Sequence, residues 1–180
     1  MEAIECIKTR RSVRRYTEEV ISSETIKEII DVARMAPTWK NTQTIRYMIV
    51  QDKGLIEKVT ADCLLGFEHN AKTLSQCNCL VVLLQKTGIC GYERDGSFST
   101  SKGAGWEMFD AGIAAQTFCL AAHEKGIGSC ILGIFDDAKV AEVLDVPEGQ
   151  AVTALIPIGV PKFNPDPTPR KEVEELVMFK

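Results

Sequence analysis

The stretch CLVVLLQK, residues 79–86, decides the fold class because it opens with an unbroken run of apolar residues. A short, continuous apolar run that contains adjacent valines is typical of a strand buried inside a sheet, whereas a half-exposed strand alternates between apolar and polar residues. We therefore expect a buried strand at Cys79–Lys86 and assign the rest of the chain around it.

Outward from this strand, apolar segments alternate with segments of helical periodicity. Further strands are expected at YMIVQD (47–52), SCILGIF (129–135) and VTALIPIGVP (152–161). A helix should begin at Ser22 or Ser23, either of which is a good N-cap, and it must stop before Pro37. The other helices are expected over residues 2–9, 55–65, 68–76, 106–125 and 136–144.

The longest expected helix, residues 106–125, is apolar around much of its circumference, which indicates a central and deeply buried position. Gly126 follows it as the expected C-cap. The glycine- and serine-rich residues 87–105 predict a long loop or lid. After Pro161 the chain is punctuated by prolines and is expected to form an arm that extends over a partner.

Composition excludes several classes of function. The chain has 180 residues, 45% of them hydrophobic, and a formal net charge of −4, so we expect one domain over residues 1–180 that binds no nucleic acid. No segment approaches the roughly 18 apolar residues that a membrane span needs. The first residues do not resemble a signal peptide, because acidic residues interrupt them. We expect a cytoplasmic protein without a membrane partner.

The usual catalytic and metal-binding patterns are missing. Seven cysteines are an odd number, several lie in apolar segments, and no second pair stands at zinc spacing, so we expect buried thiols and no metal. The sequence has no G-x-S-x-G pattern, and neither histidine has an evident nucleophilic partner. GIGSCI (126–131) lacks the third glycine of a dinucleotide fingerprint and follows a helix, not a strand.

The basic run TRRSVRRY, residues 9–16, carries the clearest chemical signal. Such a run can be a solvated surface or an arm that binds nucleic acid. It can also bind phosphate, because two guanidiniums from Arg10, Arg11 and Arg14 together with the hydroxyl of Ser12 can surround one. A second basic segment, TPRKE (168–172), is either a solvated tail or a further contact to the same phosphate.

APTWKNTQ, residues 36–43, is a third candidate. Thr38, Asn41 and Gln43 follow the end of a helix and carry short polar groups that suit a heteroaromatic ring with mixed donors and acceptors. The alternative is that these residues only terminate the helix and form a turn. The residues alone leave both interpretations open.

In order and spacing these segments resemble the nitroreductase family of flavin-dependent oxidoreductases. The motifs are R-R-S-x-R-x-Y, A-P-T-x-x-N-x-Q, D-x-G-x-x-x-Q within a long helix, G-x-G-S-C, I-P-I-G-x-P and a basic tail. The resemblance implies an α+β fold with a central, mainly antiparallel sheet flanked by helices and an extended C-terminal arm. It also implies FMN as cofactor and a homodimer with a shared flavin site at each end of the interface.

The resemblance further implies three groups of cofactor-binding residues. The phosphate and ribityl chain of FMN would be held by Arg10, Arg11 and Ser12, joined by Arg170 or Lys171, whereas Arg14 would meet either the flavin or the nicotinamide cofactor. The partner subunit would supply Pro37, Thr38, Trp39 and Asn41. The isoalloxazine ring would have Asn70 near its edge and the backbone of Ile131, Leu132 and Gly133 against one face.

On this basis we expect an oxidoreductase that receives hydride from NADH or NADPH and reduces a small aromatic acceptor, a nitroaromatic or a quinone, in a ping-pong cycle. A flavin carries out the electron transfer itself, which agrees with the absence of a catalytic triad. Two alternatives stay open: a specialised reaction on the same scaffold, such as dehalogenation or flavin fragmentation, and a flavin- or nucleotide-binding protein without turnover.

Overall fold

Strand β2 (Cys79–Lys86) lies inside a four-stranded antiparallel sheet, as its sequence predicts. The structure is a computed structural model that describes residues 1–180. The strand order is β1 (Ile45–Val50), β2, β4 (Gln150–Gly159) and β3 (Gly128–Ser129). Every pairing is antiparallel, so the expected mainly antiparallel α+β fold is confirmed.

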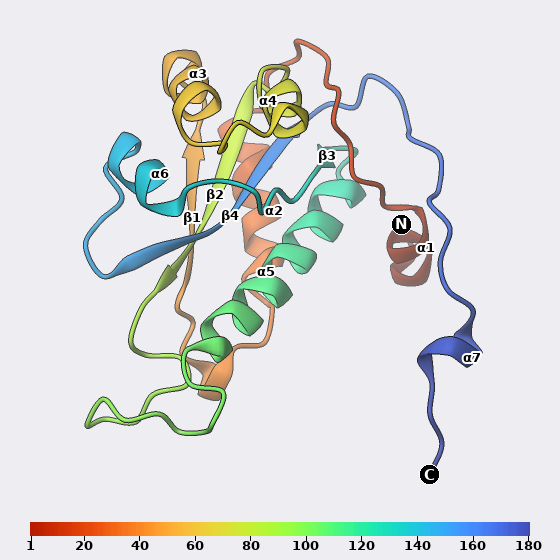
Figure 1. Ribbon diagram of the computed structural model, residues 1–180. Coiled ribbons are helices and arrows are strands. Elements are labelled where there is room, and N and C mark those ends of the chain that lie inside the picture. The colour runs from red at the N-terminus through yellow and green to blue at the C-terminus, as the bar shows by residue number, and fades with distance from the viewer.

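Both faces of the sheet are covered by helices (Figure 1). The even-numbered apolar side chains of β2 join one hydrophobic cluster and the odd-numbered ones join another, because successive side chains of a strand point to opposite faces. The first cluster includes residues of α3 (Lys53–Asp62), α4 (Glu68–Leu74) and α6 (Asp137–Val143). The second includes residues of α2 (Ser23–Ala33) and α5 (Gly105–Glu124). This double covering explains the continuous apolar run.

Local signals set several helix ends where the sequence places them. Ser22 is the N-cap of α2 and its hydroxyl accepts a hydrogen bond from the backbone N–H of Thr25, and the helix ends at Ala33, ahead of Pro37. Gly126 terminates α5 with a φ of 74°, which confirms it as the C-cap. Asp52 caps α3, so this helix begins two residues earlier than its apolar pattern indicates.

The expected strand at residues 129–135 is wrong beyond its first residue. Strand β3 ends at Ser129, and only Leu132 pairs again with β4, through Leu155. Pro157 is the cause: it lies opposite Cys130 in this register and has no N–H to continue the ladder. Residues 130–135 therefore form an irregular segment along the edge of β4.

Helix α5 is less buried than expected, because Met108 and Phe109 on one side are more than half-exposed in the single chain. The short helix α1 (Ala3–Thr9) covers its other end, where the thiol of Cys6 donates to the carbonyl of Leu120. Residues 87–104 contain no helix or strand, as expected of the loop before α5. No helix is long and apolar enough to cross a membrane.

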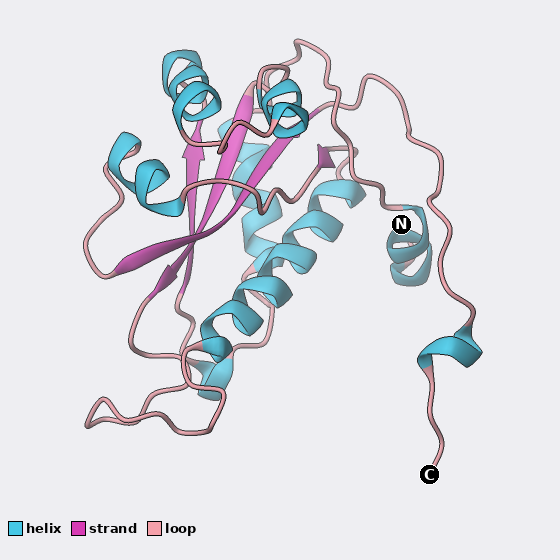
Figure 2. Cartoon of the chain, viewed as in Figure 1, coloured by secondary structure: helices cyan, strands magenta, loops and turns pink.

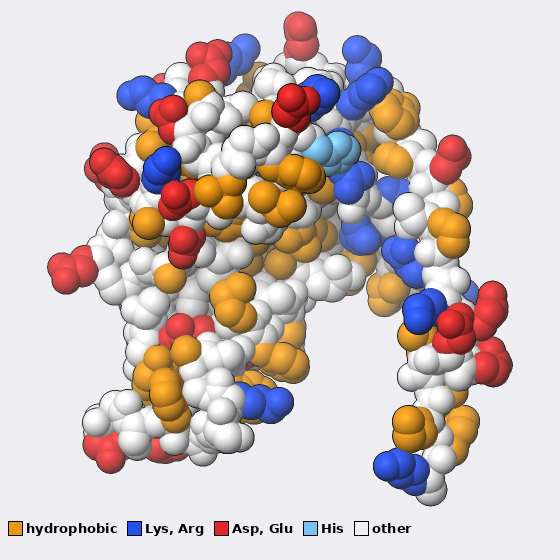
Figure 3. Space-filling model, in the orientation of Figure 1, with side chains coloured by type: hydrophobic (Ala, Val, Ile, Leu, Met, Phe, Trp, Pro, Cys, Tyr) orange, Lys and Arg blue, Asp and Glu red, His pale blue; other side chains and the backbone are white.

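The C-terminal residues form the expected extended arm, with one short helix that the sequence analysis did not predict, α7 (Val173–Leu176) (Figure 2). The arm passes α1 and then stands apart from the body (Figure 1). Figure 3 shows Lys and Arg side chains gathered where the arm leaves the body and hydrophobic side chains at its free end.

Candidate functional site

The basic run lies across the end of the sheet as a loop, residues 10–16, that we call the arginine loop. Ser12 pairs in parallel with Ser129, and the N–H of Val13 donates to the carbonyl of Ser129 at 2.9 Å. The Tyr16 hydroxyl is buried, donates to the carbonyl of Val13 at 2.6 Å and lies 3.0 Å from that of Pro157. Burial raises the pKa of this phenol. The hydrogen bonds of Val13 to Ser129 and of Tyr16 to Pro157 thus hold the loop against the end of the sheet.

Two glycines allow this close approach. A Cβ atom added to Gly128 would lie 2.7 Å from the side chain of Val13, and one added to Gly159 would lie 2.7 Å from that of Tyr16. No side chain fits at such distances, so glycine is required where the arginine loop crosses β3 and β4. The glycines of the motifs G-x-G-S-C and I-P-I-G-x-P therefore have a packing role.

Three residues of the arginine loop, Arg10, Ser12 and Arg14, act on the pKa of the Cys130 thiol. Burial raises the pKa of that thiol, while the charges of Arg14 and Arg10 and a hydrogen bond with Ser12 act in the opposite direction. Ser12 and Arg10 are half-buried and Arg14 is exposed. The Arg14 guanidinium lies 3.4 Å from the carbonyl of Ser12, so one short loop carries two guanidiniums and a hydroxyl of the kind that bind a phosphate group.

Arg11 takes a different direction from the other arginines. Its guanidinium donates to the carbonyls of Lys8 at 2.7 Å and Arg10 at 2.9 Å, at the C-terminal end of α1. Its charge, with that of Arg10 and with burial, lowers the pKa of His123, which lies against Thr9 at the end of α5. The structure therefore does not bring the Arg11 side chain to Cys130.

The irregular segment after β3 lies next to the arginine loop and presents backbone to solvent. Leu132 is buried and exchanges two hydrogen bonds with Leu155, whereas Ile131, Gly133 and Ile134 are exposed. Asn70, a buried residue of α4, donates from its amide to the carbonyl of Ile134 at 3.1 Å. Residues 131–134 thus form a backbone segment that is held in place and partly exposed. Because the positive charges of the arginine loop lie next to it, the segment suits a flat ring that carries a phosphate group.

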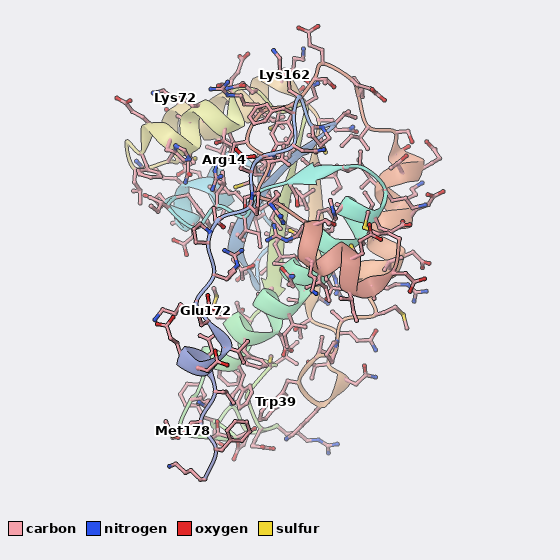
Figure 4. All side chains as sticks on the ribbon, turned by 90° about the vertical axis from the view of Figure 1, so that its right-hand side faces the viewer. Arg14, Trp39, Lys72, Lys162, Glu172 and Met178 are labelled. Carbon is pink, nitrogen blue, oxygen red and sulfur yellow. The ribbon has the colours of Figure 1, made fainter.

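The second predicted group, residues 37–41, lies at the opposite end of α5. The N–H of Trp39 donates to the Asp110 carboxylate at 2.8 Å, which fixes the turn against the N-terminal half of that helix. Because Asp110 and His123 are thirteen residues apart and a helix rises 1.5 Å per residue, the two groups lie about 20 Å apart along the axis. Figure 4 shows Trp39 and Arg14 well separated.

The turn has an unusual backbone, for which the sequence gives little warning. Lys40, Asn41 and Gln43 all have positive φ, between 44° and 56°, although none is glycine. The hydroxyl of Thr38 accepts from the N–H of Gln43 at 3.1 Å and stabilises this shape. Such a conformation costs free energy and is found mostly where surrounding contacts impose it.

The predicted contacts from the arm stay within the arm in this single chain. Arg170 donates to the hydroxyl of Thr168 at 2.7 Å, and the ammonium of Lys171 lies 3.7 Å from the carboxylate of Glu175. The base of the arm, however, is attached to the arginine loop, because the N–H of Lys162 donates to the carbonyl of Arg15.

Sequence reasoning gave no role to Asp110, although it is part of the motif D-x-G-x-x-x-Q. Its carboxylate is 2% exposed and also accepts from the thiol of Cys90 at 3.2 Å. That carboxylate, the charge of Glu107 and burial raise the pKa of Cys90 to about 12. An acidic residue directly before the apolar segment AGIAA of this helix was the available signal, because buried carboxylates need hydrogen-bonding partners.

Comparisons with known proteins agree with this arrangement. A model described as "Nitroreductase family" matches residues 7–160. A putative NADH dehydrogenase/NAD(P)H nitroreductase of Archaeoglobus fulgidus is 28% identical over 92% of this chain and 95% of its own length. An FMN reductase [NAD(P)H] of Bacillus subtilis is 28% identical over 94% of this chain and 70% of its own. A crystal structure of a nitroreductase family protein from Streptococcus pneumoniae shares the fold with a TM-score of 0.87, at 20% identity, over 99% of this chain and all of that one.

Proposed function

The chain belongs to the nitroreductase family, and from that premise we propose that it is an FMN-dependent oxidoreductase that takes hydride from NADH or NADPH and reduces nitroaromatic or quinone-type acceptors. The FMN reductase of B. subtilis, 28% identical, supports the cofactor and the donor. When bound, FMN supplies the hydride and electron transfer, so the protein has only to bind and orient the reactants.

The observation that carries the proposal is the pairing of the arginine loop with β3. It fixes the backbone of the loop that carries Arg10, Ser12 and Arg14 next to Ser129, from which the irregular segment 130–135 continues. In our proposal the guanidiniums and the hydroxyl hold the phosphate of FMN, and the backbone of residues 131–134 lies against one face of the ring. Asn70 keeps that segment in place through Ile134.

The proposed site is completed by a second copy of the chain. A twofold axis that packs α5 against its copy in antiparallel orientation places the N-terminal end of one helix beside the C-terminal end of the other. The turn that holds Pro37, Thr38, Trp39 and Asn41 then reaches the arginine loop of the partner, which it cannot reach within one chain. The exposed Met108 and Gly112 of α5 form the contact face in this arrangement.

The arm supports the same arrangement. Val173, Leu176, Met178 and Phe179 are each between 67% and 90% exposed, which is more apolar surface than a free tail normally carries. We propose that the arm packs on the partner and brings Arg170 or Lys171 toward a flavin phosphate. Nitroaromatics and quinones suit the resulting site because both are flat and electron-poor.

The test is a visible spectrum of the purified protein after saturation with FMN. Under anaerobic conditions NADH or NADPH should bleach the visible absorption band of the flavin, and a nitroaromatic or quinone should restore it at a rate equal to turnover. A protein that binds FMN and stays oxidised with both nicotinamide donors is a binder without turnover and contradicts the proposal.

A further inference from the structure

Three aromatic side chains meet at the N-terminal end of α5, and one of them, Trp39, belongs to the turn assigned above to the partner's flavin. A cavity of about 420 Å³ opens there, lined by Lys102, Gly105, Trp106 and Phe109. The ring of Trp106 lies 4.5 Å from that of Trp39 and 5.4 Å from that of Phe109, measured between centroids. We call these three residues the aromatic wall.

The wall is rigid and part of it is free. The indole N–H of Trp106 donates to the hydroxyl of Thr100 at 2.8 Å, which fixes the orientation of the ring. Phe109 is 58% exposed, so the chain itself buries less than half of this side chain. Gly105 adds no side chain to the floor of the cavity. The volume is within the range of pockets that hold small aromatic ligands.

Lys102 is the charged residue of this cavity, and it has no acidic partner. It is absent from all six ion pairs of the chain. The carboxylates at this end of the molecule have other partners. Glu93 pairs with Lys40 and accepts from the hydroxyl of Ser99, and Asp95 accepts from that of Ser97. Glu107 accepts from the N–H of Gly88, and Asp110 accepts from the N–H of Trp39 and the thiol of Cys90. The Lys102 ammonium therefore has no ion-pair partner in the chain, and it lines the same cavity as the exposed ring of Phe109.

From this combination we propose that the cavity is the acceptor pocket and that Lys102 selects flat aromatic acceptors carrying a negative charge, such as a carboxylate. The inference rests on the proposed function, because the shared dimer would place this end of α5 over the partner's flavin. The wall stacks on the ring of the acceptor, and the ammonium pairs with its charged substituent. A neutral aromatic acceptor gains only the stacking contact and no ion pair with Lys102.

Binding without reduction can be measured locally, because both tryptophans of the chain belong to the wall. We would titrate the FMN-loaded protein with benzoate and with benzyl alcohol, which present the same ring with and without a charge, and follow indole fluorescence. Benzoate should bind about two- to fivefold more tightly, the size of one partly solvated charge pair. Lys102→Met should abolish the difference.

Arg94→Met is the matched control. Arg94 lies in the same loop, is exposed, forms no ion pair and does not line the cavity, so this variant removes an equal charge from the same region. It should keep the preference for benzoate. In steady-state assays Lys102→Met should raise KM for 4-nitrobenzoate about two- to fivefold. The KM for 4-nitrobenzyl alcohol and for the nicotinamide donor should stay unchanged.

Three results would overturn the inference: equal binding of benzoate and benzyl alcohol by the unmodified protein, an equal loss of preference in the Lys102 and Arg94 variants, or a rise in KM confined to the nicotinamide donor. The last would make Lys102 a contact of the donor. If benzoate is preferred but no acceptor is reduced, the pocket is supported and the proposed oxidoreductase activity fails, so the two failures are distinguishable.

Discussion

Replacing Asp110 with alanine should destabilise the protein by about 2–4 kcal/mol. The carboxylate accepts one hydrogen bond from the Trp39 N–H at 2.8 Å and one from the Cys90 thiol at 3.2 Å. A hydrogen bond to a charged group contributes about 1.5–3 kcal/mol and a weak thiol bond less, and the N–H of Trp39 would be left without a partner. Asp110→Asn keeps an acceptor oxygen and should cost about 1 kcal/mol.

Urea unfolding of the FMN-free protein at one fixed concentration measures this difference, because cofactor binding and association both change apparent stability. For a chain of this length, a loss of about 3 kcal/mol corresponds to a Tm lower by roughly 6–12 °C. The control is Asp31→Ala. Asp31 pairs with Arg34 at 2.8 Å, but both side chains are about two-thirds exposed, so its loss should cost under about 1 kcal/mol.

Equal midpoints for Asp110→Ala and Asp31→Ala would refute the reasoning, since a buried anchor and an exposed ion pair cannot contribute alike. The functional consequence can be followed in the same samples. Loss of the bond to Trp39 releases the turn that we assign to the partner's flavin, so Asp110→Ala should also lower FMN affinity. Asp110→Asn should restore most of it.

Three further predictions concern the cofactor, the thiols and the assembly. Arg10→Ala should weaken FMN binding about ten- to a hundredfold, measured by fluorescence titration. Arg11→Ala removes hydrogen bonds to the carbonyls at the end of α1 and should have a smaller effect on FMN binding. Equal effects of the two variants would contradict the phosphate assignment. Replacing Cys77 and Cys79 by serine should change turnover by no more than a few-fold. Burial raises the pKa of both thiols to about 12, so they stay protonated at neutral pH. A collapse of activity with an intact fold would indicate thiol chemistry. Sedimentation at low micromolar concentration should show a dimer, for which we expect an interface of over about 2,000 Å². Deletion of residues 162–180 should weaken this dimer. A fully active, flavin-loaded monomer would exclude the shared site.

The sequence predicts the elements whose causes are local. The strand β2 follows from its own apolar run, the start of α2 from Ser22, and the end of α5 from Gly126. The strand expected at residues 129–135 fails because its cause lies elsewhere. Pro157 interrupts the ladder from the neighbouring strand, and a pattern of apolar residues in one segment carries no information about the partner's missing N–H.

The candidate site likewise contains residues that the sequence predicts and contacts that it does not predict. Ser12 and the arginines could be recognised as phosphate ligands from their chemistry, yet their meeting with residues 129–134 depends on Gly128 and Gly159, which let the loop approach. Asp110 escaped assignment because its partner, Trp39, lies in a turn 71 residues earlier. Neither contact has a signature within a short window of sequence.

The structure places the two site segments, residues 10–16 and 37–41, at opposite ends of α5, so one chain does not bring them into a single pocket. The outer side of α5 shows how two copies would join these segments, because residues that one monomer core does not need, Met108 and Gly112 among them, remain uncovered there. A second α5 packed there in antiparallel orientation would cover them and bring the two ends together. The excess apolar character of this helix, read at first as deep burial, is therefore better explained as the surface through which two copies build one site.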